Sequence, residues 1–368
     1  MKENSRREFI KKGTTVAFLY AIFNPFSLFA DEKVALKTPS WIELVDYARW
    51  SPTVHNLQPH KLKIISDTEA ELYYDPKRLL PVGDPNAKFA TVAMGIFIEN
   101  LSIAASCKGF KVIISEIINP ISNDKTENTI FLKLQIVPKN SFEKLDRELI
   151  KTRRTSRLQY DKKQINKDIL ENIKKETNLF DHDFSYTSDI EVVDFIVDLN
   201  QKTLFEDLKD KNNREELDGL FRYSLEEAES HKDGLWAKCM GFPGFLMKNV
   251  FHHHEKWNIG FRKTLLTKFY KSSFKGTSTI CWFSGKFENT TDWLIAGKMF
   301  SRSWLLFTEN NIYIHPFGSL ITNLEANNEI QKKIVSSNEN AKIWLIFRVG
   351  YSTEPTRSFR LNTSEIII

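Results

Sequence analysis

Three arginines and two hydroxyl side chains lie within five residues of the chain, in the run Arg153-Arg154-Thr155-Ser156-Arg157. A guanidinium binds a phosphate group through two parallel, charge-assisted hydrogen bonds, and neighbouring hydroxyl groups donate further ones. The run therefore predicts a segment that binds an anion. A solvent-exposed basic loop, which describes most short runs of charge, is the alternative interpretation.

A second polar segment, residues 48–59, reads Ala-Arg-Trp-Ser-Pro-Thr-Val-His-Asn-Leu-Gln-Pro. Asn56 and Gln58 offer amide donors and acceptors on a backbone restrained by proline, which suits binding to the edge of a planar heterocycle. The alternative is an ordinary polar turn between a helix and a strand. The sequence names no acid–base partner for Ser51 or His55, so it indicates no nucleophile.

The histidines and cysteines do not form a metal-binding pattern. His252–His254 are adjacent, and adjacent histidines on a helix point in different directions, whereas a zinc site needs converging ligands. Cys107, Cys239 and Cys281 contain no Cys-x-x-Cys pair and predict neither a zinc site nor a disulfide framework. The aromatic residues beside the histidines favour a lid or a membrane-facing element. We expect no metal and identify no catalytic residue.

The N-terminus has the composition of an export signal. Arg6 and Arg7 precede an uncharged apolar run, residues 13–30, that ends in a small residue. Adjacent arginines are typical of the twin-arginine route, whose cargo crosses the membrane folded. The pattern predicts a signal over residues 1–30, the twin-arginine translocation machinery as a partner, and a periplasmic or outward-facing, membrane-anchored protein. A short transmembrane anchor or a basic amphipathic tail is the alternative.

Charge and composition narrow the class of protein. The 368 residues carry a net charge of +5, of which residues 1–12 contribute +3 and residues 31–368 only +2. We ascribe the excess to the N-terminus and expect no nucleic-acid partner, because phosphate-backbone binding needs a basic stripe. With 41% hydrophobic and 27% charged residues, the chain is neither disordered nor a polytopic membrane protein.

The apolar spacing predicts the elements that must position these residues. Helices are expected over 40–49, 86–108, 141–151, 166–177, 189–208, 213–230 and 291–308, and strands over 61–66, 71–75, 112–118, 130–137, 277–284 and 342–349. The stretch 232–275 is aromatic and basic and shows no clear period. Because helices outnumber strands, and the strands cluster in hairpins as well as between helices, the pattern favours an α+β fold.

Several segments together resemble the nitroreductase family of FMN-binding α+β proteins. Residues 51–60 are similar to the family's Pro-Ser-x-x-Asn-x-Gln-Pro segment, and residues 153–157 to its arginine clamp. Further similarities lie in the helix 92–109, which carries a Gly-x-x-x-x-Asn-Leu pattern, and in the segments 314–318, 348–351 and 357–360. The resemblance touches most of residues 40–360.

The order of these motifs departs from that of ordinary members, in which the clamp comes first and two subunits share each flavin site. Here the clamp follows the 51–60 segment, which resembles the Acg-like branch, where one chain holds two degenerate halves and mimics the homodimer. The resemblance implies a monomer with halves over 31–140 and 141–368, the latter carrying a possible lid at 232–275. It implies one FMN site.

The resemblance also assigns roles to residues. One half would supply groups for the ring and ribityl atoms, the other the clamp, with Arg153, Thr155 and Arg360 or Arg357 at the phosphate and Arg157 near the pyrimidine side of the ring. The backbone of Phe317-Gly318 would approach the ring centre. Val54 and His60 depart from the family pattern. The implied cofactor-binding set is Pro52, Thr53, Asn56, Gln58, Arg153, Arg154, Thr155, Arg157, Phe317, Gly318, Arg357 and Arg360.

The expected function is an exported FMN-dependent oxidoreductase that reduces nitroaromatic or quinone-like compounds. The flavin would carry the redox chemistry, and the protein would supply orientation and electrostatics. A protein that sequesters FMN without turnover is the first alternative, and a flavin-free protein that keeps only the fold is the second.

Overall fold

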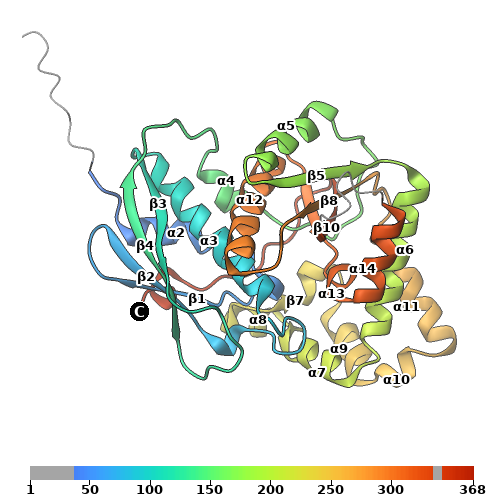
Figure 1. The fold of residues 1–368 in the computed structure, drawn as a ribbon. Helices are drawn as coiled ribbons and strands as arrows, with labels where there is room; N and C mark the ends of the chain where they lie inside the picture. Colours follow the sequence, from blue (N-terminus) through green and yellow to red (C-terminus); the bar gives the residue numbers. More distant parts are fainter. Residues whose placement is uncertain (1–36, 335–341) are drawn as a thin grey trace, which may run out of the picture. The chain divides into compact units, whose positions relative to one another are not determined.

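Two antiparallel sheets of four strands each, with helices packed on them, form the framework of the computed structural model (Figure 1). The structure describes residues 37–334 and 342–368, so the signal predicted over residues 1–30 lies outside the described residues. Residues Thr38–Ile368 form one compact unit. Sheets and helices alternate irregularly along the chain, and the predicted α+β class is confirmed.

The first sheet comes from residues 60–138 and has the strand order β1-β2-β4-β3. Every second residue of β2 is buried, as expected for a strand with one covered face. β1 and β2 form the predicted hairpin, with His60 opposite Tyr74. The strands predicted for this region are therefore confirmed, with small shifts at their ends. They are β1 (His60–Ile64), β2 (Glu69–Tyr74), β3 (Phe110–Ile117) and β4 (Thr129–Pro138).

The second sheet has the order β5-β8-β10-β9, and the sequence predicts only its two inner strands. β8 (Thr279–Gly285) and β10 (Lys342–Gly350) are almost wholly buried and read as continuous apolar runs. The outer strands β5 (His182–Thr187) and β9 (Tyr313–Pro316) are short, and β5 is only half-buried and mostly polar. Strand alternation over so few residues does not stand out from a loop.

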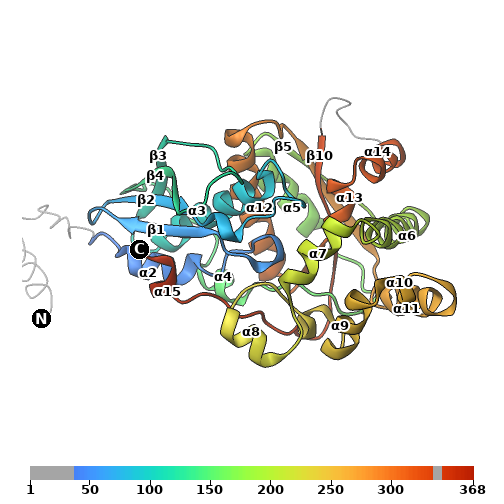
Figure 2. The same cartoon turned by 90° about the horizontal axis from the view of Figure 1, so that it is seen from below.

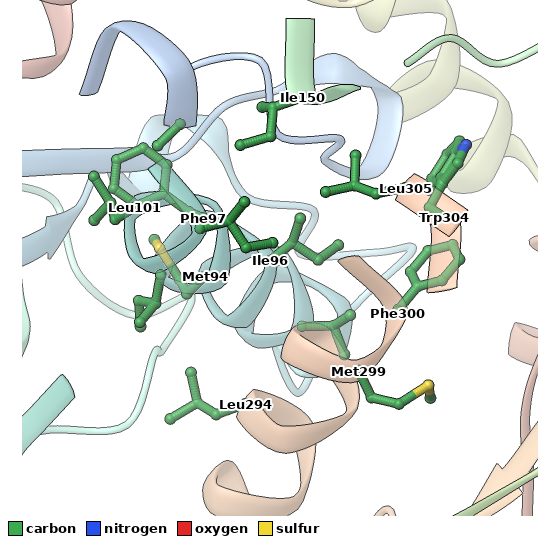
Figure 3. Packing of buried hydrophobic residues seen from close by; sticks show 14 of the residues in the cluster. Met94, Ile96, Phe97, Leu101, Ile150, Leu294, Met299, Phe300, Trp304 and Leu305 are labelled. Atoms are coloured by element: carbon green, nitrogen blue, oxygen red, sulfur yellow. The ribbon is translucent and has the colours of Figure 1, made fainter. Parts of the chain in front are cut away.

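The helices α3 (Lys88–Ser106) and α12 (Thr290–Glu309) cross at the centre of the molecule. α3 is long and apolar enough to cross a membrane but is mostly buried inside the protein, so we assign it to the core. Figure 3 shows Phe97 of α3 packed among buried side chains near the crossing with α12. The helices touch at Gly95 and Gly297, where an added Cβ would lie 2.3 Å from the carbonyl oxygen of Leu294 or 2.1 Å from that of Val92.

Two of the other predicted helices differ from expectation. Residues 141–147 form a loop rather than the start of a helix, because the Glu143 carboxylate accepts hydrogen bonds from the backbone amides of Lys144 and Leu145. The helix predicted over 213–230 is broken by a short strand, after which Ser224 caps a new helix. The remaining helices are α2 (Trp41–Ala48), α4 (Glu148–Thr152), α5 (Lys167–Asn178), α6 (Ile190–Asp207), α7 (Lys211–Leu220), α8 (Leu225–His231), α9 (Gly244–His252), α10 (His254–Trp257), α11 (Gly260–Ser272), α13 (Ser319–Thr322), α14 (Leu324–Lys333) and α15 (Thr363–Ile366). Of these, α13, α14 and α15 were not predicted.

The short elements complete the chain. The strands β6 (Phe221–Arg222) and β7 (Leu235–Trp236) pair with each other in parallel. The 3₁₀ turns η1 (Val54–Asn56), η2 (Pro76–Arg78) and η3 (Ala237–Met240) join larger elements. η1 and η3 both lie in segments that the site uses.

The C-terminal segment returns from the second sheet to the first. After β10 ends at Gly350, residues 351–368 run back until Ile367 bridges Leu62 of β1 and α15 lies beside α2 (Figure 2). The backbone amide of Ile368 donates to the carbonyl of Leu62 at 2.9 Å. Residues 351–368 therefore leave the second sheet and contact the first. The division into halves at residue 140 stays a prediction.

A cluster of ion pairs ties α3, α5 and α12 together around Arg302. Its guanidinium contacts Glu99 at 3.0 Å, Glu143 at 2.9 Å and also Glu176, and all four side chains are at least four-fifths buried. Lys139 reaches the second oxygen of Glu143 at 2.8 Å. Burial favours the neutral form of Glu143, but hydrogen bonds from Arg302 and Lys139 outweigh it and lower the pKa of Glu143 to about 2.

Candidate functional site

A cavity of about 690 Å³ lies where most of the predicted site residues meet. This volume is within the usual range for small-molecule sites. Its walls combine aromatic and aliphatic side chains with a cluster of arginines. Most lining residues come from the segments 50–56, 80–85, 89–96, 153–157, 204–220, 234–240, 316–323 and 356–360.

Four arginines line one part of this cavity. Arg153 follows α4, donates to the carbonyl of Trp50 at 3.2 Å, and places its guanidinium 4.4 Å from the ring centre of Trp304. Arg157, four residues on, has no hydrogen-bond acceptor among the described residues. The C-terminal segment supplies the other two, Arg357 and Arg360.

The two C-terminal arginines are held by the segment that carries the Asn motif. Arg360 donates to the side-chain oxygen of Asn56, whose amide group in turn donates to the carbonyl of Phe359 at 3.0 Å. Arg357 stacks over Trp50 with 3.4 Å between its guanidinium carbon and the ring centre. Residues 300 positions apart in sequence thus form one wall, because the C-terminal tail crosses the cavity.

The arginine cluster carries positive charge that the protein does not neutralise. Within residues 37–334 and 342–368, none of Arg153, Arg157, Arg357 and Arg360 forms an ion pair with a carboxylate. Burial is the main cause that lowers all four pKa values, and repulsion between neighbouring arginines adds to it at Arg153, Arg357 and Arg360. The pKa falls to about 10 for Arg357 and about 9 for Arg360.

An anion would relieve this electrostatic strain. Guanidinium groups stay protonated in proteins, so the lowered pKa values express unfavourable burial of cations rather than neutral arginines. Within the part of the chain that the structure describes, the Nε atoms of Arg153 and Arg154 are both buried without a partner, and Arg153 is only 8% exposed. Buried donors are nearly always hydrogen-bonded, and an orphaned one beside a cavity indicates a ligand acceptor.

Arg154 and Thr155 differ from the other members of the clamp. Arg154 lines the cavity, but its guanidinium already contacts Glu354 at 2.5 Å and the carbonyl of Pro355 at 2.9 Å. Thr155 forms a parallel bridge with Ile314 and lines the cavity beside Arg154. The clamp segment is therefore fixed against β9 by its backbone.

The loop that contains Asn56 has an unusual backbone. His55, Asn56 and Gln58 have φ values of 48°, 60° and 54°, in the left-handed region that non-glycine residues rarely adopt. The Thr53 hydroxyl accepts a hydrogen bond from the Gln58 backbone amide at 3.0 Å. Strained backbone persists where the surroundings hold it, and it clusters at functional sites.

A buried chain of hydrogen bonds positions the start of this loop. The amide group of Asn100, on α3, donates to the Ser51 hydroxyl at 2.7 Å. The Ser301 hydroxyl, on α12, donates to the side-chain oxygen of Asn100 at 2.7 Å. Ser51 itself donates to the carbonyl of Ala48 at 2.6 Å, at the end of α2. The two central helices therefore fix the segment that enters the cavity wall.

Two predicted residues do not reach the cavity. The side chain of Gln58 is fully buried and donates to the carbonyls of Asn56 and Lys232, while it accepts from the backbone amide of Leu361. These three hydrogen bonds join the loop to Lys232 and Leu361, and Gln58 is not among the residues that line the cavity, so its contact with a ligand stays a prediction. Phe317 is buried in a cluster of apolar side chains, and its backbone amide donates to the carbonyl of Ile346. Of the predicted pair Phe317-Gly318, Gly318 alone lines the cavity.

The remaining predicted residues line the cavity together with some that the sequence did not indicate. Pro52, Thr53, Asn56 and Gly318 are at the wall, as is Val54, one of the departures from the family pattern. The other departure, His60, is buried and stacks on Phe97 with 4.2 Å between ring centres. The clamp residues Arg153, Arg154, Thr155 and Arg157 and the C-terminal Arg357 and Arg360 also line it.

The wall formed by α6 and α7 was not anticipated. Four leucines line the cavity there: Leu204, Leu208, Leu217 and Leu220. Their spacing in the sequence indicates only an amphipathic helix and no binding site. The Glu216 carboxylate accepts hydrogen bonds from the backbone amides of Val82 and Gly83, both at 2.8 Å, and so ties α7 to the opposite rim. Of the stretch 232–275, residues 234–240 supply the lining groups.

The histidines and acidic side chains of the described residues do not add a metal site to this cavity. Among the described residues, no group of three or more histidine, cysteine or acidic side chains is arranged to hold a metal ion. His252 contacts Asp218 at 3.4 Å on the surface of the molecule. His55, at the cavity wall, has a pKa lowered to about 4 by burial and by the charge of Arg157, so it is a neutral imidazole at pH 7.

Comparison with known proteins finds similarity in structure only. No protein-family model and no curated protein matches the chain. A candidate nitroreductase from Anabaena variabilis is similar over 84% of this chain and 87% of its own, with 8% identity and a TM-score of 0.45. An FMN-dependent nitroreductase from Mycobacterium smegmatis, solved with NADPH, aligns over 59% and 94%, with 14% identity and a TM-score of 0.37. A nitroreductase from Bacteroides fragilis with bound FMN aligns over 58% and 91%, with 15% identity and a TM-score of 0.32.

Proposed function

We propose that the cavity binds FMN and that the chain is an exported oxidoreductase of the nitroreductase type, acting on small nitroaromatic or quinone-like compounds. The observation that carries the proposal is the cluster of Arg153, Arg157, Arg357 and Arg360, which have no carboxylate partner among the described residues. A phosphate monoester supplies the missing negative charge. The resemblance of the segments 51–60 and 153–157 to flavin-binding motifs is the reason for proposing that this phosphate monoester is FMN.

The residues present fit this cofactor. The buried, unpartnered Nε of Arg153 is a donor suited to a phosphate oxygen. Arg360 and Arg357 lie near enough to Arg153 for their charges to lower its pKa, so one phosphate could contact all three guanidiniums. Thr155 lies in the same wall and offers a hydroxyl. Trp50, Trp304 and Trp236 give the cavity flat apolar surfaces of the kind that hold planar rings.

Each group has a role in this proposal. Arg153, Arg360 and Arg357 hold the phosphate, and Arg157 supplies positive charge to the pyrimidine side of the ring. Bound FMN supplies the capacity to accept electrons from a donor and pass them to an aromatic acceptor. The chain's own residues orient the cofactor, keep its charge balanced and exclude water with the leucines of α6 and α7. One chain supplies both walls, which is the basis for proposing a monomer that mimics a dimer.

A second candidate function is sequestration of FMN without turnover. The observation that favours it is the tie between α7 and the opposite rim, through Glu216 and the amides of Val82 and Gly83. A rim held closed would keep the flavin in and substrates out. The purified protein distinguishes the two functions: flavin bleached by NADPH supports an accessible reductase, whereas flavin bleached only by dithionite supports storage or another electron donor.

Substitution of the clamp tests the assignment of the cofactor site. Arg153→Ala is expected to weaken FMN binding by about 100-fold, because a charge-assisted hydrogen bond to a buried group contributes about 1.5–3 kcal/mol. Quenching of flavin fluorescence on titration with FMN measures the dissociation constant. Arg147→Ala is the matched control, since its guanidinium contacts Glu43 at 3.2 Å and the residue is not among those that line the cavity, and we expect a change of less than about fivefold.

Unchanged FMN binding by the clamp variants would contradict the assignment of the phosphate site. If Arg153→Ala and Arg360→Ala both bind FMN as tightly as the unchanged chain, while circular dichroism shows intact folding, the cluster does not hold the phosphate. A chain that takes up no FMN at all would leave the flavin-free alternative.

Export by the twin-arginine route is a separate part of the proposal and rests on Arg6 and Arg7 in the sequence. Arg6→Lys with Arg7→Lys is expected to retain the chain in the cytoplasm, because the route reads the arginine pair and not charge alone. Cell fractionation with immunoblotting measures this. Lys11→Arg with Lys12→Arg is the control for a change of cation type outside the pair. Unchanged export of the double lysine variant would contradict the assignment.

A further inference from the structure

The segment from α9 to α11 concentrates exposed apolar and basic side chains. It projects at the edge of the molecule in both views, away from the two sheets (Figures 1 and 2). α11 has no buried residue over its 13 positions, and α10 has none either. α11 contacts the core through Tyr270, whose ring packs against the buried Phe274 with 5.1 Å between ring centres, and its outer face stays open to solvent or to a partner.

The apolar groups of this segment are large and unusually exposed. Phe261, Leu265 and Phe269 are spaced four residues apart and so lie along one face of α11, with exposed fractions of 79%, 49% and 42%. Phe245 on α9 is 80% exposed, and Ile259, just before α11, is 67% exposed. Other exposed apolar residues of the described chain are scattered, which is ordinary, whereas five within 25 residues mark an interaction surface.

The same segment carries a local excess of positive charge. Residues 244–275 contain seven lysines and arginines against one acidic residue, Glu255, a net charge of +6. The rest of residues 31–368 therefore has a net charge of −4, since the whole of that range has +2. The net charge of +2 over residues 31–368 therefore conceals a strongly basic segment, because acidic residues elsewhere offset it.

Packing within the segment holds these groups in place. The indole nitrogen of Trp257, on α10, donates to the side chain of Asn249 on α9 at 2.8 Å. Arg262 lies over the ring of Trp257, with 5.9 Å between the guanidinium carbon and the ring centre. Phe269 contacts Phe242 at 4.7 Å between ring centres and leaves part of its own ring open to solvent. The surface is thus a formed structure and not a loose loop.

We propose that this surface, defined by Phe245, Ile259, Phe261, Leu265 and Phe269 with the surrounding cations, docks on an anionic lipid bilayer. Aromatic and aliphatic side chains that enter the headgroup region, ringed by lysines and arginines, are the composition of an interfacial membrane-binding helix. Cations near an anionic leaflet each add to the affinity, and the pronounced charge excess of residues 244–275 complements such a leaflet. A soluble, wholly polar polyanion would match the cations but would leave the five exposed apolar side chains without a use.

Vesicle sedimentation tests the proposal with residues 31–368, so that the apolar run at residues 13–30 makes no contribution. This chain includes the whole compact unit, Thr38–Ile368. The unchanged chain is expected to bind phosphatidylcholine vesicles that contain 30 mol% phosphatidylglycerol at least tenfold more tightly than pure phosphatidylcholine. Phe245→Ser with Phe261→Ser is expected to weaken that binding by about tenfold or more, because each loses apolar area from the interface.

Matched variants separate lipid insertion from general adhesion. Phe142→Ser removes a 90% exposed phenylalanine outside the surface and is expected to leave binding unchanged. Lys248→Glu with Arg262→Glu is expected to weaken binding to the anionic vesicles by about tenfold or more, whereas Lys125→Glu with Lys174→Glu, at exposed positions elsewhere, changes it little. Because every altered residue is exposed, melting temperatures should stay alike.

Three results would overturn the proposal. The first is absence of binding to the anionic vesicles. The second is binding that depends on the cations but is unaffected by the paired serine substitutions at Phe245 and Phe261. The third is binding to soluble polyglutamate as tight as to the vesicles, which would identify an acidic macromolecule as the partner. None of these outcomes depends on FMN, so the test stands apart from the proposed function.

Discussion

Replacing Gly297 by alanine is expected to lower the free energy of unfolding by about 3 kcal/mol, at the upper end of the cost of overpacking a core. The new Cβ would lie 2.1 Å from the carbonyl oxygen of Val92 and 2.9 Å from the Cα of Gly95. Both obstacles are backbone atoms of α3, so no side chain can turn aside. The two central helices would have to separate, and the residues of α12 that line the cavity, Phe300 and Trp304, would move with them.

Chemical denaturation followed by circular dichroism measures this loss. Gly219→Ala is the matched control, since Gly219 also lies within a helix, α7, and an added Cβ there has no neighbouring atom within 4 Å. Alanine at that position should be neutral or stabilise the protein by about 0.5–1 kcal/mol, because glycine has the larger conformational entropy to lose. Equal stability of the two variants would show that the helices are not in contact at Gly95 and Gly297.

Arg302→Met is the second substitution with a large expected effect, about 3–5 kcal/mol of destabilisation at pH 7. It would leave Glu99, Glu143 and Glu176 facing one another without the cation that they share. Lys133→Met is the matched control: its pair with Glu116 has the same ionic chemistry at 2.8 Å but is about half exposed, so its loss should cost less than about 1 kcal/mol.

The effect of Arg302 should depend on pH in a defined direction. The pKa of Glu143 is lowered from 4.5 to about 2, so the folded state binds its proton less readily than the unfolded state. The resulting stabilisation, about 3 kcal/mol, is present in full above pH 4.5 and is lost as the pH falls toward 2. The difference in stability between the unchanged chain and Arg302→Met should therefore shrink from pH 7 to pH 3. A difference that is the same at both pH values would contradict the assignment.

The sequence predicts the fold well where a segment is long and strongly periodic. α3 and α12, β8 and β10 show apolar patterns over many residues, and they are found within a few positions of the predicted ranges. The edge strands β5 and β9 are missed, because their pairing depends on a neighbour distant in sequence and not on their own alternation. The loop 141–147 is missed because Arg302, distant in sequence, holds the Glu143 side chain through two hydrogen bonds that only the fold creates.

The sequence predicts the charged and polar residues of the site better than the apolar residues that complete its walls. Ten of the residues named by motif resemblance line the cavity, including Arg357 and Arg360 from a distant part of the chain, and their contact with a cofactor stays a prediction. Gln58 is not among the lining residues, because an amide group that suits a ligand suits the backbone around Asn56 equally well. The leucines of α6 and α7 carry no chemical signal, since an apolar residue that lines a cavity and one that fills a core look alike in sequence.

The position of Arg357 and Arg360 has a consequence for the order of events during synthesis. These arginines lie on the segment 351–368, which pairs with β1 at its end, and they complete the wall that Arg153 begins. A ribosome-bound chain therefore cannot assemble the cluster until residues 357–360 have left the ribosome, after both sheets have been synthesised. A chain cut short between β10 and Arg357 would keep the strands of both sheets but lack the two cations, so uptake of a phosphorylated ligand would report that synthesis had passed Arg360.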